Sequence, residues 1–124
     1  MDRGKGWRKV WRKIHPESSR IGESLRVRWT MPAVNQLQGL FDYISEGNPA
    51  AAGRIVRRIH EAILRTARMP NAGRIGRVPG TREITVSRTP YVIAYRIVEN
   101  MIHVLAILHG AQEWPESFEP PSSS

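Results

Sequence analysis

The chain has 124 residues, of which 40% are hydrophobic, and this supports one domain with one modest core. It contains no cysteine, which excludes a disulfide framework and thiol chemistry, and its four histidines lack the spacing of zinc ligands, so neither a metal nor another cofactor is expected. The formal net charge of +8 favours anionic partners. No apolar run approaches the roughly 20 residues that cross a bilayer, and the basic start leads into no apolar stretch, so the sequence favours a cytoplasmic protein without a membrane partner.

The first part of the chain differs in composition from the rest. Residues 1–24 carry seven Lys/Arg against three acids and include every lysine, whereas all later basic residues are arginine. Trp7 and Trp11 are one helical turn apart, so a short basic amphipathic helix that contacts nucleic acid, a membrane surface or the core is one alternative. The interpretation that we prefer is a flexible basic extension, followed by a domain at 25–118 and a disordered Pro/Ser tail at 119–124.

Past this extension, a strand and a helix are predicted. Residues 25–29 alternate between apolar and arginine side chains, as in a strand with one apolar face. Thr30 is in position to cap a helix and Pro32 falls in the first turn of that helix, where its missing amide costs nothing. The apolar positions then recur at helical spacing, at Val34, Leu37, Leu40, Phe41 and Ile44.

A second helix follows directly. Gly47 ends the first helix, Asn48 caps the second and Pro49 opens it, and Pro70 stops it after about Met69. Its buried stripe is predicted to contain Ile55, Val56, Ile59, Ile63 and Leu64, with arginines and Glu61 on the outer face. Two helices this close in sequence form a hairpin whose apolar face must cover the strands.

Three strands are predicted after the helices. Apolar residues recur at every second position near Ile84, from Tyr91 to Ile97 and from Ile102 to Leu108, which is typical of half-buried antiparallel strands. The predicted fold is therefore α+β with the order β-α-α-β-β-β, a helical hairpin packed on an antiparallel sheet. Trp114 and Pro115, beyond the last strand, are expected to act as an apolar plug.

Arginine is concentrated between Pro49 and Arg88, where nine arginines face only two acids. On the second helix most of these are expected to be solvated, with Glu61 able to pair with Arg65 one turn later. Arg74, Arg77 and Arg82 lie in a Gly/Pro loop and at a strand start, where positioned side chains more often bind something, so we expect them to contact a target.

Arg82, Arg96 and His109 form the one predicted constellation that has chemistry. A histidine can act as general acid or base near neutral pH, and two arginines can stabilise the phosphorane formed when an RNA 2′-hydroxyl attacks its phosphate. The plainer alternatives are that Arg96 pairs with an acid such as Glu83 and that His109 only ends its strand. The sequence alone leaves both open.

Three short segments carry a family resemblance: residues 76–83, 90–96 and 108–115, each at the start or end of a strand. In this order, after two helices, they resemble toxins of the RelE/ParE superfamily of type II toxin-antitoxin systems, over residues 25 to about 118. The resemblance implies a toxin that causes growth arrest and is neutralised by a cognate antitoxin with an acidic C-terminal segment. ParE-type members inhibit DNA gyrase and are linked to plasmid stabilisation, whereas RelE-type members cut mRNA on the ribosome without a metal.

The resemblance also distinguishes between these two targets. RelE-type ribonucleases tend to have a basic residue after the aromatic that opens the third predicted strand, another after the fourth, and a tyrosine near the C-terminus. The matching positions here are Val92, Gln112 and Phe118, which supply neither positive charge nor a proton carrier. The sequence therefore favours a gyrase inhibitor that is not an enzyme, and the alternative is a ribosome-dependent mRNA endonuclease using Arg82, Arg96 and His109.

The antitoxin is expected to bind beside the basic surface of the helical hairpin. Apolar residues of both helices are predicted to leave a groove into which an acidic segment folds while its carboxylates pair with arginines. The predicted contact residues are Leu37, Phe41, Arg54, Arg58, Ile59 and Ile63.

Overall fold

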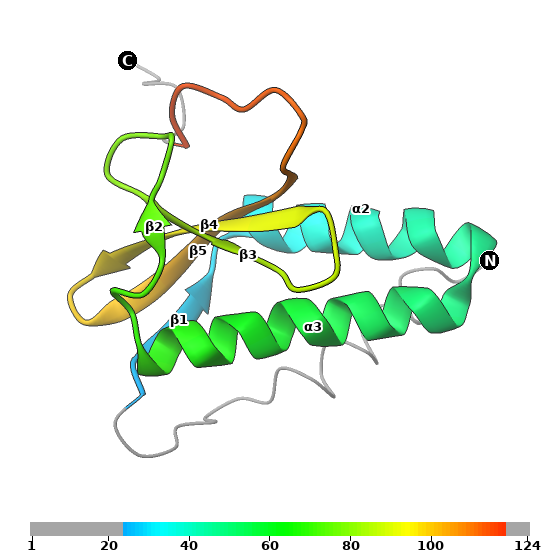
Figure 1. The fold of residues 1–124 in the computed structure, drawn as a ribbon, viewed down its shortest axis with the longest axis horizontal. Helices are drawn as coiled ribbons and strands as arrows, with labels where there is room; N and C mark the ends of the chain where they lie inside the picture. The colour runs from blue at the N-terminus through cyan, green and yellow to red at the C-terminus, as the bar shows by residue number, and fades with distance from the viewer. Residues whose placement is uncertain (1–23, 119–124) are drawn as a thin grey trace.

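The computed structural model describes residues 24–118. The predicted basic extension, apart from residue 24, and the predicted tail both lie outside the described residues. The elements follow one another as β1 (Arg26–Trp29), α2 (Met31–Gly47), α3 (Pro49–Arg68), β2 (Arg74–Ile75), β3 (Arg82–Thr85), β4 (Tyr91–Val98) and β5 (Met101–His109). The two helices run side by side and antiparallel beside the sheet (Figure 1). This is the predicted α+β fold, with one additional strand, β2.

The sheet is mixed, whereas the sequence predicted a purely antiparallel one. Its strand order is β1-β5-β4-β3-β2. The pairs from β2 to β5 are antiparallel, but β1 runs parallel to β5, with Val27 opposite Ile102. Parallel neighbours need a long crossover between them, and the helical hairpin is part of that connection. The first strand of the chain therefore lies against the last one.

Proline and asparagine set the helix boundaries, as predicted. The side chain of Asn48 accepts a hydrogen bond from the Ala51 N–H at 3.1 Å, which caps α3, and each helix has a proline in its first turn. Thr30 stands at the N-cap position of α2, but its side chain makes no capping bond, so that part of the prediction was wrong. Its hydroxyl instead donates to the Val104 carbonyl at 2.8 Å and fastens the end of β1 to β5.

The helices cover one face of the sheet and form the main core with it. Fully buried side chains from both helices pack there with Tyr95, Ile93 and Ile102 of the sheet, including Leu37, Val56, Ile59 and Ile63. Tyr95 is the largest of them, and its hydroxyl donates to the Pro70 carbonyl at 2.7 Å while accepting the Gly73 N–H at 3.2 Å. The buried ring thus holds the turn that leads out of α3.

The opposite face of the sheet carries a second, smaller apolar cluster. Its buried members are Ala94, Ala106 and Leu108, and Trp114 and Phe118 from the segment after β5 pack onto them. Residues 110–118, called the strap below, therefore cover part of this face. Trp114 acts as the apolar plug that its position predicted, whereas Pro115 is exposed.

Candidate functional site

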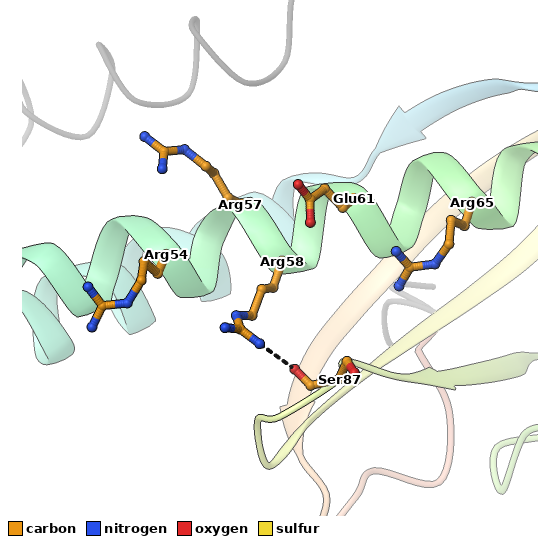
Figure 2. A pocket seen from close by; sticks show the side chains of 6 residues that line it. All are labelled: Arg54, Arg57, Arg58, Glu61, Arg65 and Ser87. Atoms are coloured by element: carbon orange, nitrogen blue, oxygen red, sulfur yellow. Dashed lines mark hydrogen bonds between the residues drawn. The ribbon is translucent and has the colours of Figure 1, made fainter.

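The outer side of α3 is lined by arginines, of which Arg58 reaches the turn between β3 and β4. Figure 2 shows this hollow of about 280 Å³, in which Arg58 Nη1 donates to the Ser87 carbonyl at 3.5 Å. Residues three and four positions apart on a helix share one side, so the sequence spacing alone gathers these charges. The lining residues are Arg54, Arg57, Arg58, Glu61, Arg65 and Ser87.

A second hollow, of about 420 Å³, continues toward the C-terminal end of α3 and shares Arg65 with the first. It lies between α3 and β3 and is more apolar, with Met69 66% exposed at its rim. Its other lining residues are Ala62, Thr66, Ala72, Gly73, Arg74, Glu83, Ile84 and Thr85. We call the two hollows together the α3 trough.

Glu83 is a buried carboxylate held between two arginines, with only 2% of its surface exposed. Arg74 donates to Oε1 from Nε at 3.2 Å and from Nη2 at 3.0 Å. Arg77 donates to Oε2 from its backbone N–H at 2.7 Å and from Nε at 3.2 Å, and to Oε1 from Nη2 at 3.4 Å. The loop between β2 and β3 is therefore folded around one negative charge.

The hydrogen bonds decide the titration of this carboxylate. Burial raises the pKa of Glu83, but the Arg77 backbone N–H and the two arginine side chains act the other way and outweigh it. The net pKa lies below the ordinary glutamate value because the charged form is the one that receives these bonds. Glu83 is thus ionised at neutral pH and functions as a structural anchor.

Arg77 connects this anchor to the strap. Its guanidinium carbon stands 3.8 Å from the centre of a Trp114 ring, and its Nη1 donates to the Gly110 carbonyl at 3.3 Å. A guanidinium stacked on an indole is a favourable cation–π contact. In Figure 1 the loop before β3 and the strap accordingly lie on the same side of the molecule. Glu83, Arg77 and Trp114 form a clasp that keeps the strap on the sheet.

His109 is exposed, but its imidazole is already engaged. The Ala111 N–H donates to Nδ1 at 3.1 Å, and the ring meets Tyr91 edge-on with centroids 6.0 Å apart. A backbone N–H can only donate, so Nδ1 is an acceptor and the proton of the neutral ring is on Nε2. The Gln112 side chain accepts the His109 N–H at 2.7 Å, so this residue terminates the strand rather than supplying charge.

The structure does not bring Arg82, Arg96 and His109 together. Arg82 lies opposite the core residue Tyr95, so it shares the helix-covered face, whereas Arg96 follows Tyr95 and faces the other way. His109 is opposite Tyr91, five residues along β4 from Arg96, or roughly 16 Å. The three residues therefore lie apart, on both faces of the sheet and at different points along β4.

Arg82 makes hydrogen bonds to backbone carbonyls that the sequence did not indicate. Its Nη1 donates to the carbonyls of Asn71 at 3.2 Å and Gly73 at 2.7 Å, so it braces the turn after α3. The suggested Arg96–Glu83 pair is also replaced, because Glu83 is taken by Arg74 and Arg77. Of the three predicted target-binding arginines, Arg74 and Arg77 keep exposed side chains at 59% and 41%.

The predicted apolar contacts for an antitoxin are mostly inaccessible. Leu37, Ile59 and Ile63 are fully buried in the main core, and Phe41 packs partly against it, so no open groove runs between the two helices at these positions. Helical periodicity identified residues that are apolar and face inward, but it did not show that the sheet already covers them. Arg54 and Arg58, in contrast, line the α3 trough.

Two absences complete the description of residues 24–118. No helix there is long and apolar enough to cross a membrane. In the same residues, no group of three or more His, Cys, Asp or Glu side chains is arranged to hold a metal ion.

Comparison with known proteins identifies the family. The sequence model of the ParE toxin of the type II toxin-antitoxin system parDE matches residues 27–114, which run from β1 through the clasp residue Trp114. The chain belongs to the ParE toxin family. It is therefore the toxin of a type II toxin-antitoxin system.

Two relatives of this ParE-family toxin are themselves named as toxins, one of them with a RelE name. A Sinorhizobium fredii protein that carries the name of a toxin, Y4kP, is 40% identical over 91 residues, which are 73% of this chain and 94% of the relative. Toxin RelE2 of Caulobacter vibrioides is 34% identical over 87 residues, covering 70% and 97%. The names alone do not separate the two possible targets.

Among solved structures, a chain of the chromosomal ParDE TA system from P. aeruginosa is similar to this toxin. It superposes with a TM-score of 0.65 at 27% identity, and the match covers 71% of this chain and 98% of that one. The agreement extends over nearly the whole of that chain, which confirms the α+β fold.

Proposed function

We propose that this ParE-family toxin arrests growth by binding DNA gyrase in the cytoplasm, not by cutting mRNA, and that a cognate antitoxin neutralises it. The observation that carries this proposal is the strap. Its apolar side chains cover the face of the sheet on which a ribonuclease of the superfamily needs charge and a proton carrier. The P. aeruginosa neighbour comes from a ParDE toxin-antitoxin system, and this supports an antitoxin partner here as well.

The three positions that distinguish a nuclease all have packing roles in this chain. Val92 is 3% exposed, so a charged side chain at this position would be buried. Gln112 holds the end of β5, and Phe118 lies against Trp114 with ring centroids 6.4 Å apart. Side chains that are packed in this way supply neither charge nor a proton carrier at these three positions, but they can present a fixed shape to a protein.

His109 is also poorly arranged for proton transfer. A general base needs a free nitrogen lone pair, and the only lone pair of the neutral ring receives the Ala111 N–H. Nε2 carries a proton and can act only as a donor until that contact breaks. These contacts favour a binding surface over a nuclease centre.

The alternative is a ribosome-dependent mRNA endonuclease that uses Arg82, Arg96 and His109. Its support is the 34% identity to the Caulobacter protein named toxin RelE2, together with an exposed histidine at the end of β5. The separation of the three side chains described above counts against it.

Two parallel assays decide between these targets. Purified toxin is added to gyrase with relaxed plasmid, and separately to a translating extract in which mRNA ends are mapped by primer extension. We expect lost supercoiling or trapped cleaved DNA, with intact mRNA. His109→Ala should retain most toxicity, as should the control His103→Ala. Codon-specific mRNA cleavage that disappears in His109→Ala and persists in His103→Ala would establish the nuclease instead.

A further inference from the structure

We propose that the uncovered half of the outer sheet face binds the phosphate backbone of duplex DNA. The outer face is the one that the helices do not cover, and the strap packs on it only around Ala94, Ala106 and Leu108. In Figure 1 the strap leaves from one end of β5, and the turn that joins β4 to β5 lies at the other end. The sheet near that turn carries three arginines that take no part in the clasp or the α3 trough.

We call these arginines, Arg26, Arg28 and Arg96, the outer-face patch. The contact that we propose for them goes beyond the proposed function, because it requires neither gyrase nor an antitoxin. It would be a nucleic-acid contact made by the toxin itself.

Strand alternation turns the patch away from the helices. In β1, Val27 and Trp29 pack against the main core, so the two arginines that alternate with them point to the outer face. In β4, Arg96 stands between Tyr95 and Ile97, which belong to the same core or pack against it. All three arginines therefore share one face of the sheet.

The strand register places two of these arginines in one row. Arg28 of β1 is opposite His103 of β5, and His103 is opposite Arg96 of β4. Neighbouring strands are about 4.8 Å apart, so the Cα atoms of Arg28 and Arg96 are roughly 10 Å apart. Arg26 stands two residues along β1, or roughly 7 Å from Arg28. Three positive charges are thus concentrated on a small area.

The protein itself compensates these charges only in part. Arg26 and Arg28 are exposed, and neither has an ion-pair partner among residues 24–118. The described acid closest along the chain to the patch is Glu99, which lies in the turn beyond β4. The three charges lie within about one Debye length of one another, about 10 Å at 0.1 M salt, so they repel. An anion bound across the patch would relieve this repulsion.

The composition of the patch favours DNA over an acidic protein. Protein interfaces have an apolar centre enriched in aromatic residues, whereas interfaces with DNA are more polar and positively charged. The side chains between the arginines are only partly exposed and include no Phe, Tyr or Trp; they are Val98, Met101, His103 and Leu105. Arginine can also donate two parallel hydrogen bonds to one phosphate.

The same composition favours a DNA duplex over RNA or a single strand. Proteins hold single strands by stacking bases on exposed aromatic rings, but Trp114 and Phe118 of the strap are packed on the small apolar cluster. Recognition of double-stranded RNA relies largely on ribose 2′-hydroxyls, and arginine side chains offer them no acceptor. Phosphate contacts alone carry no sequence information, so binding should be independent of base sequence.

The test measures binding of the full-length toxin to a short DNA duplex of mixed sequence, without gyrase, over a series of salt concentrations. Each phosphate contact contributes roughly 0.9 to the slope of log affinity against log salt. Arg26→Gln together with Arg28→Gln should therefore reduce the slope by about 2 and weaken binding at least ~tenfold at about 0.1 M salt. Residues 1–23, which carry seven Lys/Arg, are the same in every variant, so the differences report on the patch.

A matched control removes the same charge elsewhere. Arg57→Gln together with Arg68→Gln changes two exposed residues of α3, in the helical layer on the other face of the sheet, and should leave the slope nearly unchanged. Arg96→Gln should reduce the slope by about 1. Equal losses in the Arg26/Arg28 variant and in the control would mean attraction by overall charge and would remove the site.

Two competitors identify the class of ligand. An RNA duplex of the same sequence and a polyglutamate chain of similar charge are titrated into the toxin and into its Arg26/Arg28 variant. We expect both to bind the toxin more weakly than the DNA duplex does. Either competitor binding as tightly as DNA, with the same loss in the variant, would overturn the assignment to DNA.

Gyrase supercoiling is assayed separately, so the two proposals can fail independently. A toxin that inhibits gyrase while its Arg26/Arg28 variant binds DNA like the wild type overturns the outer-face contact alone. A toxin that binds DNA through the patch but leaves supercoiling unchanged overturns the proposed function alone.

Discussion

Replacing Glu83 with glutamine tests the clasp directly, because the change keeps the shape of the side chain and removes its charge. Five hydrogen bonds converge on the carboxylate, three of them from arginine side-chain nitrogens close to 3 Å. The amide nitrogen of a glutamine would face one of these donors and leave it unpaired. The exchange therefore weakens the hold on Arg74, on Arg77 and, through Arg77, on the strap.

The expected loss can be bounded. Removing one partner of a buried ion pair costs about 3–5 kcal/mol when the other charge is left buried. Arg74 and Arg77 are 59% and 41% exposed and would regain water, so the cost here is nearer 2 kcal/mol. At about 4–8 °C per kcal/mol for a domain of this size, the melting temperature should fall by about 8–16 °C. Glu61→Gln, an exposed acid on α3, is the control and should change stability by less than about 0.5 kcal/mol.

The pH dependence supplies the refuting result. The folded-state pKa of Glu83 is lowered, so its contribution is complete above the pKa of the unfolded chain, about 4.3, and is lost as pH falls through the folded value. Wild type and Glu83→Gln should differ at about pH 7, and the difference should shrink as pH falls below about 4.3 in urea or thermal unfolding. A gap that stays constant over this range, or no gap at neutral pH, would show that the charge of Glu83 does not hold the loop and the strap.

Three further predictions concern the frame around the site. A chain starting at Leu25 should fold and keep its toxicity, because strand β1 begins directly after it; aggregation of this form in the presence of antitoxin would place the extension in the core. Gly76→Ala should destabilise the protein, since its Cβ would meet the Thr81 carbonyl oxygen at 2.9 Å, whereas Gly53→Ala, in open space on α3, should stabilise it by about 0.5–1 kcal/mol in urea unfolding. Tyr95→Phe should cost about 1–2 kcal/mol, because the Pro70 carbonyl and the Gly73 N–H both lose a buried partner; an unchanged denaturation midpoint would contradict this.

The helices were predictable from the sequence because their boundaries depend on local chemistry. Pro32, Asn48 and Pro49 act within one turn of their own positions, and each stands where the pattern placed it. The capping bond predicted for Thr30 is absent because its hydroxyl can bond either a nearby backbone amide or the carbonyl of Val104, 74 residues away. Only the tertiary structure decides which bond forms. Strand β2 was missed because two residues give no measurable periodicity.

The candidate site was less predictable, because it depends on which faces of the elements meet. The spacing of Arg54, Arg58 and Arg65 indicated a basic helix face, but not that the turn between β3 and β4 would lie beside it. Strand alternation placed Arg82 and Arg96 in neighbouring strands without giving the register that turns them to opposite faces. Glu83 pairs with Arg74 and Arg77 and not with Arg96 because of the register between β2 and β3, which no short motif encodes.

The parallel pairing of β1 with β5 has a consequence for how the toxin is made. Residues 26–29 are among the first of the domain to be synthesised, yet the strand that pairs with them within residues 24–118 is Met101–His109, near the end of the domain. Contacts of such high sequence separation form late, and a growing chain cannot form this one until its final strand has been translated. A premature stop codon before residue 101 should therefore yield no toxin at all, only a fragment whose first strand has no place to pair.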